Sequence, residues 1–333
     1  MKTTGAAILI TGASRGIGRA LAQAAATTTS NLDVILVSRC ATTLKETTER
    51  IQSEATNDDL SARLHTVAAD VSTPAGRQSI VSAVHNINSR LAYVVHNAGT
   101  LGPLGNFRDV ASSSTTNTTT NTNTNTTTNT HSNTNDDGLH LDLDTWRSTF
   151  ATNVEAPLFL TRDLLPSLLA SSDLRGSPSR VLTLSSGAAF DSFTGIGTYC
   201  ATKAALHSVT RSLQNELDPS RVAVTSVVPG LVETDMLRLL RMAKDSAISN
   251  SYQRSIRDEN IKDDNCCCEG EGGREEKEEK VKGKKEEMRI RTSEEIAKYL
   301  CWLLFECDAN VFHERSYWDV DKEEGRIGSI GDR

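Results

Sequence analysis

The sequence has little clustered positive charge. Its 36 Lys and Arg residues are outnumbered by 43 Asp and Glu residues, which gives a net charge of -7 at pH 7. Proteins that bind nucleic acid gather Lys and Arg on one face to neutralise phosphates. The basic run Lys280–Lys285 lies between glutamates on both sides and is typical of a solvated charged segment. The composition therefore argues against nucleic acid as a partner.

Long apolar runs and a secretory leader are also missing from the sequence. No run approaches the roughly 20 apolar residues that span a bilayer. The first residues, Met1–Ile10, enter a short apolar stretch without the pattern of a secretory signal. We therefore expect a cytoplasmic protein with no membrane partner.

The cysteines lack the spacing of a metal site. The seven of them include no Cys-x-x-Cys pair, and no His stands at the distance that a zinc site needs. The triplet Cys266–Cys268 lies in a polar, charged stretch, where a metal or redox role has little support. We expect reduced thiols and no bound metal.

Short apolar runs alternate with helical patterns along most of the chain. The runs are rich in Val, Ile and Leu and do not alternate with polar residues, as expected of strands covered on both faces. The predicted strands are Ala6–Ile10, Val34–Val37, Leu64–Ala68, Ala92–Val95, Val181–Leu184 and Val222–Val228, followed later by Ser316–Val320. The predicted helices are Gly18–Thr28, Thr42–Glu54, Ala75–Ile87, Leu143–Leu169 and Thr198–Leu217, with a last one at Ile296–Phe305. Pro157 and Pro166 are expected to kink or end parts of the fourth helix. The pattern predicts an α/β fold, a Rossmann-type doubly wound parallel sheet with helices on both faces.

Two segments of low complexity interrupt this alternation of predicted strands and helices. Residues 112–137 are almost wholly Ser, Thr and Asn up to Asn135, too polar to order themselves. Residues 244–290 are dense in Glu and Lys. Both are interpreted as surface insertions in one domain that spans the whole chain, 1–333. Without them about 260 residues remain, which suits a single α/β domain.

The first predicted strand ends in a glycine-rich turn, Thr11–Gly18, and a helical pattern follows. Glycines in a strand-to-helix turn let the backbone approach a pyrophosphate, and the helix N-terminus offers free N–H groups. The spacing is Gly-x-x-x-Gly-x-Gly instead of the usual Gly-x-Gly-x-x-Gly. A tight structural turn is the alternative, but the strand before it and the helix after it favour a dinucleotide site.

An acidic residue is missing where an NAD-binding protein would place one. That acid, about 20 residues after the glycines, would bond the ribose 2′-hydroxyl. This chain has Ser38-Arg39 at that point, and Arg15 stands inside the glycine turn. Arginine suits bidentate contact with a 2′-phosphate. Ordinary surface arginines are the alternative, but the pair, without an acid, favours NADP(H).

Tyr199 and Lys203 stand four residues apart in a predicted helix. Residues at this spacing share a helix face, so both side chains can project into one cleft. A phenol is a poor acid–base catalyst at neutral pH, and a nearby ammonium lowers its pKa toward the working range. The pair alone is a weak signal because the spacing is common.

Together these motifs resemble the classical short-chain dehydrogenase/reductase family over nearly the whole chain, apart from the two insertions. They occur in the family's order, and the set is far more specific than any one of them. The matching elements are Thr11–Gly18, Asp70-Val71, Asn97-Ala98-Gly99, Asn153, Ser185-Ser186, Tyr199–Lys203 and Pro229–Thr234. The family's Ser lies 13 residues before its Tyr, which selects Ser186 over Ser185.

The resemblance implies a catalytic role for four residues. Tyr199 would donate a proton to the substrate oxygen, and Ser186 would hydrogen-bond the carbonyl. Lys203 would hold the nicotinamide ribose and lower the pKa of Tyr199. Asn153 would hold a water that links Lys203 to solvent.

The resemblance also implies a set of residues that bind NADP(H). Asp70 and Val71 would contact the adenine, Asn97 would lie over the adenosine ribose, and Val232 and Thr234 would hold the carboxamide. The full set is Gly12, Ser14, Arg15, Gly16, Ile17, Gly18, Arg39, Asp70, Val71, Asn97, Gly99, Tyr199, Lys203, Pro229, Gly230, Val232 and Thr234. His96 stands where the family often has a second Asn and is given no role.

Within the family, local features look closest to sepiapterin reductase and to benzil reductase-like members. The ending Ser316–Asp319 resembles a tail in which an Asp anchors the substrate, so Asp319 joins Ser186 and Tyr199 as a candidate substrate contact. An exposed acid after the last strand is the alternative for Asp319. The resemblance implies reduction of a ketone or vicinal dicarbonyl by a homodimer or homotetramer. Oxidation of a secondary alcohol, or a catalytically silent NADP(H)-binding regulator, are the other functions that stay open.

Overall fold

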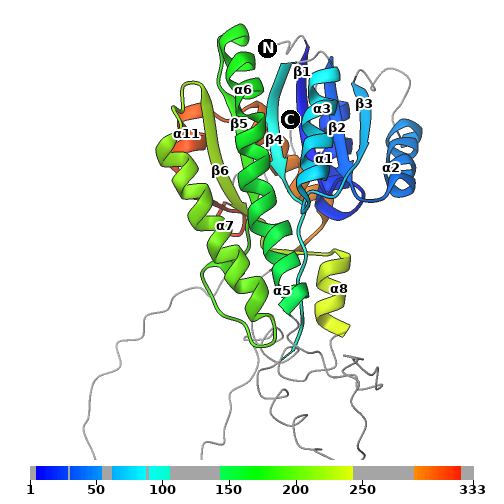
Figure 1. The fold of residues 1–333 in the computed structure, drawn as a ribbon, viewed down its shortest axis with the longest axis vertical. Coiled ribbons are helices and arrows are strands. Elements are labelled where there is room, and N and C mark those ends of the chain that lie inside the picture. Colours follow the sequence, from blue (N-terminus) through cyan, green and yellow to red (C-terminus); the bar gives the residue numbers. More distant parts are fainter. Residues whose placement is uncertain are drawn as a thin grey trace, which may run out of the picture.

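The structure is a computed structural model that describes residues 5–28, 31–54, 62–87, 90–105, 143–242 and 289–323. Its centre is a sheet of seven parallel strands in the order β3-β2-β1-β4-β5-β6-β9 (Figure 1). The strands are β1 (Ala6–Thr11), β2 (Leu32–Ser38), β3 (Arg63–Ala68), β4 (Arg90–His96), β5 (Ser179–Leu184), β6 (Val222–Val228) and β9 (Trp318–Asp319). Each predicted strand is therefore present, and the doubly wound parallel sheet is confirmed.

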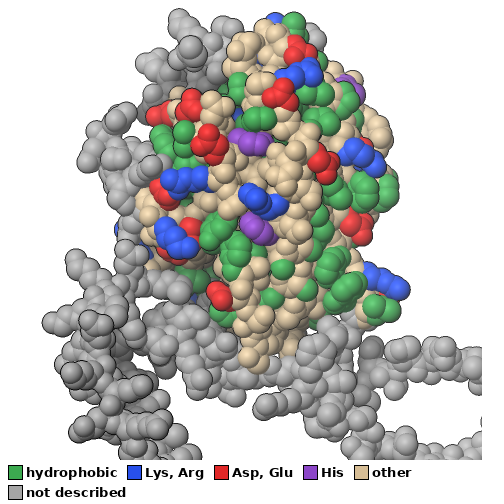
Figure 2. All heavy atoms as spheres, turned by 90° about the vertical axis from the view of Figure 1, so that its left-hand side faces the viewer, with side chains coloured by type: hydrophobic (Ala, Val, Ile, Leu, Met, Phe, Trp, Pro, Cys, Tyr) green, Lys and Arg blue, Asp and Glu red, His purple; other side chains and the backbone are tan. Residues whose placement is uncertain are grey.

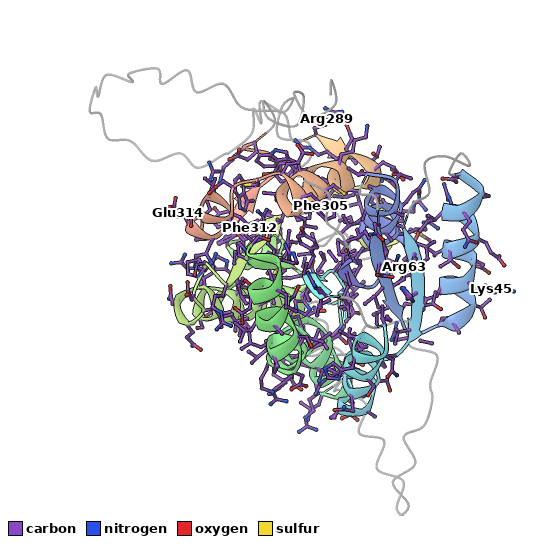
Figure 3. The ribbon with its side chains drawn as sticks, turned by 90° about the horizontal axis from the view of Figure 1, so that it is seen from above. Lys45, Arg63, Arg289, Phe305, Phe312 and Glu314 are labelled. Atoms are coloured by element: carbon purple, nitrogen blue, oxygen red, sulfur yellow. The ribbon has the colours of Figure 1, made fainter. Side chains whose placement is uncertain are left out.

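Helices cover both faces of the sheet, as Figure 3 shows from above. They are α1 (Gly16–Thr28), α2 (Ala41–Glu54), α3 (Pro74–Asn86), α5 (Leu143–Phe150), α6 (Ala156–Arg175), α7 (Gly197–Glu216), α8 (Asp235–Met242), α10 (Ser293–Phe305) and α11 (Ala309–Glu314). One apolar core packs α1 and α10 against the sheet, with Phe312 and Trp318 fully buried in it. A second core on the opposite face joins α3 and α6 to the same strands. The sheet is thus buried on both sides, which explains why its strands carry continuous apolar runs.

Local sequence signals set several helix boundaries. The Thr73 side chain caps α3 by accepting a hydrogen bond from the Gly76 backbone N–H, and Pro74 follows as the first helical residue. Thr292 and Glu295 form a reciprocal capping box at the start of α10. At the end of α6, Gly176 adopts the left-handed conformation with φ +63°, which favours glycine.

The predicted fourth helix is divided in the structure. A π turn over Ala151–Glu155 separates α5 from α6, and Pro157 falls in the first turn of α6. The expected interruption near Pro157 is therefore present, immediately before that proline. The helix α6 continues through Pro166, so this proline does not end the helix, and the expected kink there stays a prediction.

Three parts of the sequence prediction concern residues outside those described. The Thr/Asn-rich segment 112–137, nearly all of the Glu/Lys-rich segment 244–290, and the triplet Cys266–Cys268 lie there. The described end of the second segment is Ile290, which with Arg291 forms the short strand β8 (Ile290–Arg291). It pairs in parallel with β7 (Leu231–Val232), a contact that the sequence pattern did not indicate.

The surface near α7 and α11 carries charges of both signs. Lys, Arg, Asp and Glu side chains are interspersed on that face without a field of one sign (Figure 2). Of the helices described, none is both long and apolar enough to cross a bilayer.

Candidate active site

A single large cleft opens over the carboxyl ends of the strands. The chain order reverses between β1 and β4, and in open α/β sheets ligands bind at such a switch point. The cleft encloses about 2230 Å³, larger than the roughly 300–1,000 Å³ of a pocket for one small ligand. It therefore has room for two ligands side by side.

Nearly all of the predicted site residues line this cleft. They are Gly12, Ser14, Arg15, Gly16, Ile17, Arg39, Asp70, Val71, Asn97, Gly99, Ser186, Tyr199, Lys203, Pro229, Gly230, Val232, Thr234 and Asp319. Gly18 and Asn153 do not line it, and each lies behind its wall. The fold thus gathers residues from eight separate stretches of the chain at one edge of the sheet.

The glycine-rich turn connects β1 to α1 and faces the cleft. Gly12 and Gly16 adopt positive φ values of 68° and 52°, which other residues rarely adopt. A Cβ on Gly18 would lie 2.4 Å from the Gly12 carbonyl oxygen and 2.4 Å from Asn97 Nδ2. The turn therefore requires glycine at these positions, and it leaves the N-terminus of α1 open toward the cleft, where free N–H groups attract anions.

Asn97 and Thr11 hold this turn against the end of β4. Asn97 Nδ2 donates to the carbonyl oxygens of Thr11 and Gly12, at 2.9 and 3.1 Å. Thr11 Oγ1 accepts from the backbone N–H groups of Asn97 and Ala98, both at 3.1 Å. The sequence analysis included Thr11 as the first residue of the glycine-rich turn but gave it no role of its own, since a buried Thr at a strand end carries no local signal. The expected contact of Asn97 with a ribose stays a prediction.

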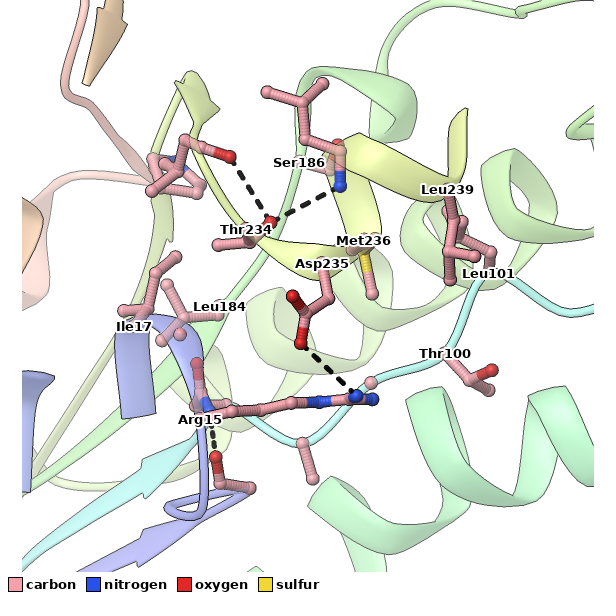
Figure 4. Close-up of a pocket in the computed structure, with 18 of the residues that line it drawn as sticks. Arg15, Ile17, Thr100, Leu101, Leu184, Ser186, Thr234, Asp235, Met236 and Leu239 are labelled. Atoms are coloured by element: carbon pink, nitrogen blue, oxygen red, sulfur yellow. Dashed lines mark hydrogen bonds and ion pairs between the residues drawn. The ribbon is translucent and has the colours of Figure 1, made fainter. Parts of the chain in front are cut away.

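Cationic side chains gather at the end of the cleft beside the glycine turn. Arg15 and Arg39 both line it, together with Arg19 and Arg50, which the sequence analysis had not singled out. Arg15 lies 3.5 Å from Asp235 at the start of α8, and both side chains are largely exposed (Figure 4). Exposed guanidinium groups next to an open helix N-terminus can bind phosphate groups.

The loop after β3 lines the cleft with Asp70 and Val71, and their expected contact with an adenine stays a prediction. Asp70 Oδ1 accepts hydrogen bonds from Ser72 N and Ser72 Oγ, at 2.9 and 2.7 Å, which fixes the loop. A Cβ on Gly76 would lie 1.9 Å from the Asp70 carbonyl oxygen, so α3 packs on this loop through glycine. Sequence analysis missed Gly76, although Thr73 and Pro74 mark the helix start beside it.

Tyr199 and Lys203 lie one turn apart on α7, as predicted, and both are buried in the cleft wall. Lys203 Nζ donates to the Leu184 carbonyl oxygen at 2.7 Å and lies 5.6 Å from the centre of the Tyr199 ring. Burial lowers the pKa of Lys203 to about 8. A positive charge this close to the phenol stabilises its ionised form, so the pair can release and accept a proton.

Ser186 follows β5 and caps a short 3-10 turn. Its hydroxyl oxygen accepts from the Ala188 backbone N–H at 3.2 Å, which leaves its own proton available to donate. The neighbouring Ser185 also borders the cleft, but its hydroxyl is buried and has no hydrogen-bond partner among the described residues. The geometry places a hydroxyl donor on the same cleft as Tyr199.

Asn153 lies in the π turn and braces the site from behind. Its Oδ1 accepts from Thr100 N at 2.9 Å, and its Nδ2 donates to Thr100 O at 2.8 Å and Thr202 Oγ1 at 3.0 Å. Thr202 is itself on α7, between the tyrosine and the lysine. The amide thus ties the loop after β4 to the catalytic face of α7. Both of its N–H groups are used in these bonds, and a water-holding role stays a prediction.

The far end of the cleft is formed by α8, the segment before α7 and the end of β9. Asp319 lines it with a mostly buried side chain, and its Oδ2 lies 3.0 Å from Lys322 Nζ. Asp321 lines it as well and pairs with the buried Arg291 of β8. The sequence analysis missed Asp321, because the partner that places it comes from a distant part of the chain.

His96 is buried under the site and is neutral. Its Nε2 lies 2.8 Å from Thr161 Oγ1 of α6, and burial lowers the pKa of the imidazole to about 3. It joins β4 to α6, in keeping with the absence of an assigned role. Across the described ranges, no three His, Cys, Asp or Glu side chains are grouped to hold a metal ion.

Comparison with known proteins places this site in a family. A family profile described as short chain dehydrogenase matches residues 6–137 and 128–245. Sepiapterin reductase of Mus musculus is 31% identical over 255 residues, which cover 75% of this chain and 83% of that protein. Sulfoacetaldehyde reductase 2 of Chromohalobacter salexigens is 27% identical over 247 residues, covering 74% of this chain and 80% of that protein.

Solved structures share the fold. L-sorbose reductase from Gluconobacter frateurii, solved with NADPH and L-sorbose, aligns with a TM-score of 0.65 and 22% sequence identity. The alignment covers 96% of this chain and 97% of that chain. The arrangement of the sheet and its helices is therefore that of a known group of structures.

Proposed function

Because the chain belongs to the short-chain dehydrogenase family, we propose that it is an NADPH-dependent carbonyl reductase that acts on a ketone or a vicinal dicarbonyl. One observation carries this proposal. Tyr199 and Lys203 share a face of α7 and border the same cleft as Ser186 and the glycine-rich turn. A proton donor, a charge that tunes it and a hydroxyl for the substrate oxygen therefore meet beside a site for a dinucleotide.

The residues present fit NADP(H). A Cβ at Gly12 would lie 2.9 Å from Ala98 Cα, so the turn is a close-packed cradle that only glycine permits. Arg15 and Arg39 border the cleft where a 2′-phosphate would lie, and no acid replaces them at the end of β2. The coenzyme, when bound, supplies the hydride, and the chain supplies position and charge.

The proposal gives a separate role to each of four polar residues, Ser186, Tyr199, Lys203 and Asn153. Ser186 donates a hydrogen bond to the substrate carbonyl and steadies the negative charge that develops on its oxygen. Tyr199 gives that oxygen a proton. The Lys203 ammonium favours proton release from the phenol and donates to the Leu184 carbonyl, which fixes its direction. Asn153 keeps α7 in register with the loop that carries Thr100.

The proposed substrates follow from the relatives and the far end of the cleft. Sepiapterin reductase matches over most of its own length, which supports a ketone or vicinal dicarbonyl of the sepiapterin or benzil kind. Asp319 faces that end and is the proposed anchor for a substrate N–H or O–H group. We also propose a homodimer or homotetramer through the helices that carry Asn153 and Tyr199; the exposed Leu143 and Trp146 lie on the adjoining α5.

The direct test is coenzyme oxidation by the purified full chain. With benzil, short diketones and sepiapterin offered in turn, we expect NADPH consumption that NADH supports at least about tenfold less well. In the variant Arg39→Ala, the KM for NADPH should rise about tenfold and the KM for NADH should barely change. Turnover of secondary alcohols alone, with no dicarbonyl reduced, would contradict the proposed function.

The pH dependence of this reaction is also predicted. Lys203 has a pKa lowered to about 8 by burial, so its charge is lost above that pH. We expect the rate of reduction to fall as pH rises from about 8 to about 10, since the neutral amine no longer assists Tyr199. Initial rates at saturating NADPH would measure this. A level rate across that range would contradict the role of Lys203.

A measurement of protein stability distinguishes this loss of rate at high pH from unfolding of the chain. The pKa of Lys203 lies below 10.5, the ordinary value for lysine, so the unfolded chain holds more protons between the two values. The contribution of Lys203 to the unfolding free energy therefore becomes more favourable as pH rises through this window. Loss of rate with a maintained melting temperature is the combination that we expect.

A further inference from the structure

The reacting end of the cleft is walled by apolar side chains. Tyr199 belongs to a cluster of buried apolar residues that includes Leu101, Ile196 and Leu240. Three partly buried side chains pack against this cluster: Leu104, Phe193 and Met236. In Figure 4 Met236 and Leu239 of α8 lie on the same side of the cleft as Leu101. A group next to the reacting carbonyl would therefore meet hydrocarbon on several sides.

Charges of both signs border the cleft, and its acids include Glu46, Asp70 and Asp235. The arginines that border its glycine-turn end are Arg15, Arg19, Arg39 and Arg50. Three further acids, Asp191, Asp319 and Asp321, also border the cleft. The lysine and arginine that pair with the last two, Lys322 and Arg291, do not border the cleft.

Arg238 and Asp191 differ in whether they are paired. Arg238 of α8 borders the cleft, but Glu233 and Asp235 bind its guanidinium at 3.1 and 3.3 Å. Asp191 forms no ion pair within the described part of the chain. Burial, and after it the negative charge of Asp191, raises the pKa of the Cys200 thiol beside Tyr199. Of the three further acids named above, Asp191 is therefore the one without a counterion among the described residues, and Lys203 is the cation on the wall that carries Tyr199.

We propose that the reacting pocket selects carbonyl compounds whose groups flanking the ketone are apolar and uncharged, and that it rejects 2-oxo acids. This inference rests on the proposed function and deepens it. A carboxylate next to the ketone would lie against hydrocarbon, where an unpaired charge is strongly disfavoured. Asp191, which has no counterion among the described residues, would also repel it, and like charges placed together serve to exclude wrong partners.

The test is a matched pair of substrates that differ in one group. The diketone 1-phenyl-1,2-propanedione and benzoylformate have nearly the same size, with a methyl group in one where the other has an anionic oxygen. Methyl benzoylformate restores neutrality and controls for the presence of the carboxyl carbon. We expect kcat/KM for the diketone and for the ester to exceed that for benzoylformate by about 100-fold or more.

The second part of the test reverses the charge of Asp191, which borders the cleft. In Asp191→Lys, the ratio of kcat/KM for the diketone to that for benzoylformate should fall at least about tenfold. The matched control is Glu314→Lys, an exposed acid on α11 that does not border the cleft (Figure 3). This control should leave the ratio unchanged, because both substitutions alter the net charge equally and only one alters the local field.

The outcomes separate this inference from the proposed function. If the diketone is reduced and benzoylformate is reduced within about tenfold of it, the charge selection is wrong and the reductase function stands. An equal change of the ratio in Asp191→Lys and Glu314→Lys would also overturn it, since net charge alone would then explain the preference. If NADPH reduces none of the three compounds nor any other dicarbonyl, the proposed function fails and this inference fails with it.

Discussion

The variant Tyr199→Phe should lose between about 100- and 10,000-fold in kcat, the range over which a positioned general acid accelerates a reaction. The substitution removes one hydroxyl and keeps the ring, which packs in the apolar cluster with Leu101 and Ile196. Lys203 keeps its bond to the Leu184 carbonyl oxygen, so the backbone around it is unaffected. Steady-state reduction of a diketone by NADPH would measure the loss.

Coenzyme binding distinguishes a chemical defect from a folding defect in this variant. The dissociation constant of NADPH, measured by fluorescence, should stay within about threefold, because the cradle at the glycine turn is untouched. The matched control is Tyr317→Phe, a tyrosine outside the cleft that packs against Phe190 with ring centres 4.6 Å apart. Full turnover in Tyr199→Phe, or equal loss in Tyr317→Phe, would show that the proton comes from another group.

The fold was predictable because its strands are buried on both faces. The residues of β1, from Ala6 to Thr11, are all buried, and those of β6 are likewise buried from Val222 to Val228. Such burial favours runs rich in Val, Ile, Leu and Ala, with small residues such as Thr225 and Ser226 between them, and that composition is visible without any contact information. The order of strands and helices then restricts the topology to a doubly wound sheet.

Contacts between distant segments were not predictable in the same way. The pairing of β7 with β8 joins Val232 to Arg291, and Arg291 reaches Asp321. Neither strand is long enough to show a pattern, and nothing near Asp321 in the sequence points to its partner. For the same reason the sequence could not show that α6 continues through Pro166. Whether a helix accommodates the missing N–H group of a proline depends on the packing around it.

The site was predictable in its membership and less so in its details. Nearly every residue named from the family's motifs lines one cleft. The motifs follow the ends of parallel strands, and these ends meet at the same edge of the sheet. Which hydrogen bonds a side chain forms depends on its neighbours in the fold, and the spacing of motifs in the sequence does not specify those neighbours. Asn153 illustrates this, as its amide binds Thr100 and Thr202 on two separate elements.

The variant Gly18→Ala should bind NADPH about 100-fold more weakly, the cost of a misplacement of about 1 Å at a binding site. Helix propensity alone would favour the change, since Ala stabilises a helix interior by about 0.5–1 kcal/mol over Gly. Packing opposes it more strongly. The new Cβ would lie 2.4 Å from the Gly12 carbonyl oxygen and 2.4 Å from Asn97 Nδ2, closer than real Cβ contacts.

Neither neighbour of Gly18 can move freely. The Gly12 carbonyl and Asn97 Nδ2 are bonded to each other at 3.1 Å, and Asn97 also holds Thr11. The clash must therefore be relieved by shifting α1 away from β1, which displaces the helix N-terminus that faces the coenzyme. Forced overpacking of this kind costs about 1–3 kcal/mol, more than the gain in helix propensity. The melting temperature should fall together with the affinity for NADPH.

The control for this prediction is Gly197→Ala at the first residue of α7. A Cβ there would meet no atom within 4 Å, and the backbone at this position does not require glycine. The two variants add the same methyl group at helical positions on the same edge of the protein, so their difference isolates the contact with Gly12 and Asn97. We expect Gly197→Ala to retain its NADPH affinity and its melting temperature. Retained affinity in Gly18→Ala as well would mean that the turn adapts without moving the helix, and the close packing of β1, α1 and β4 would not be what shapes the coenzyme site.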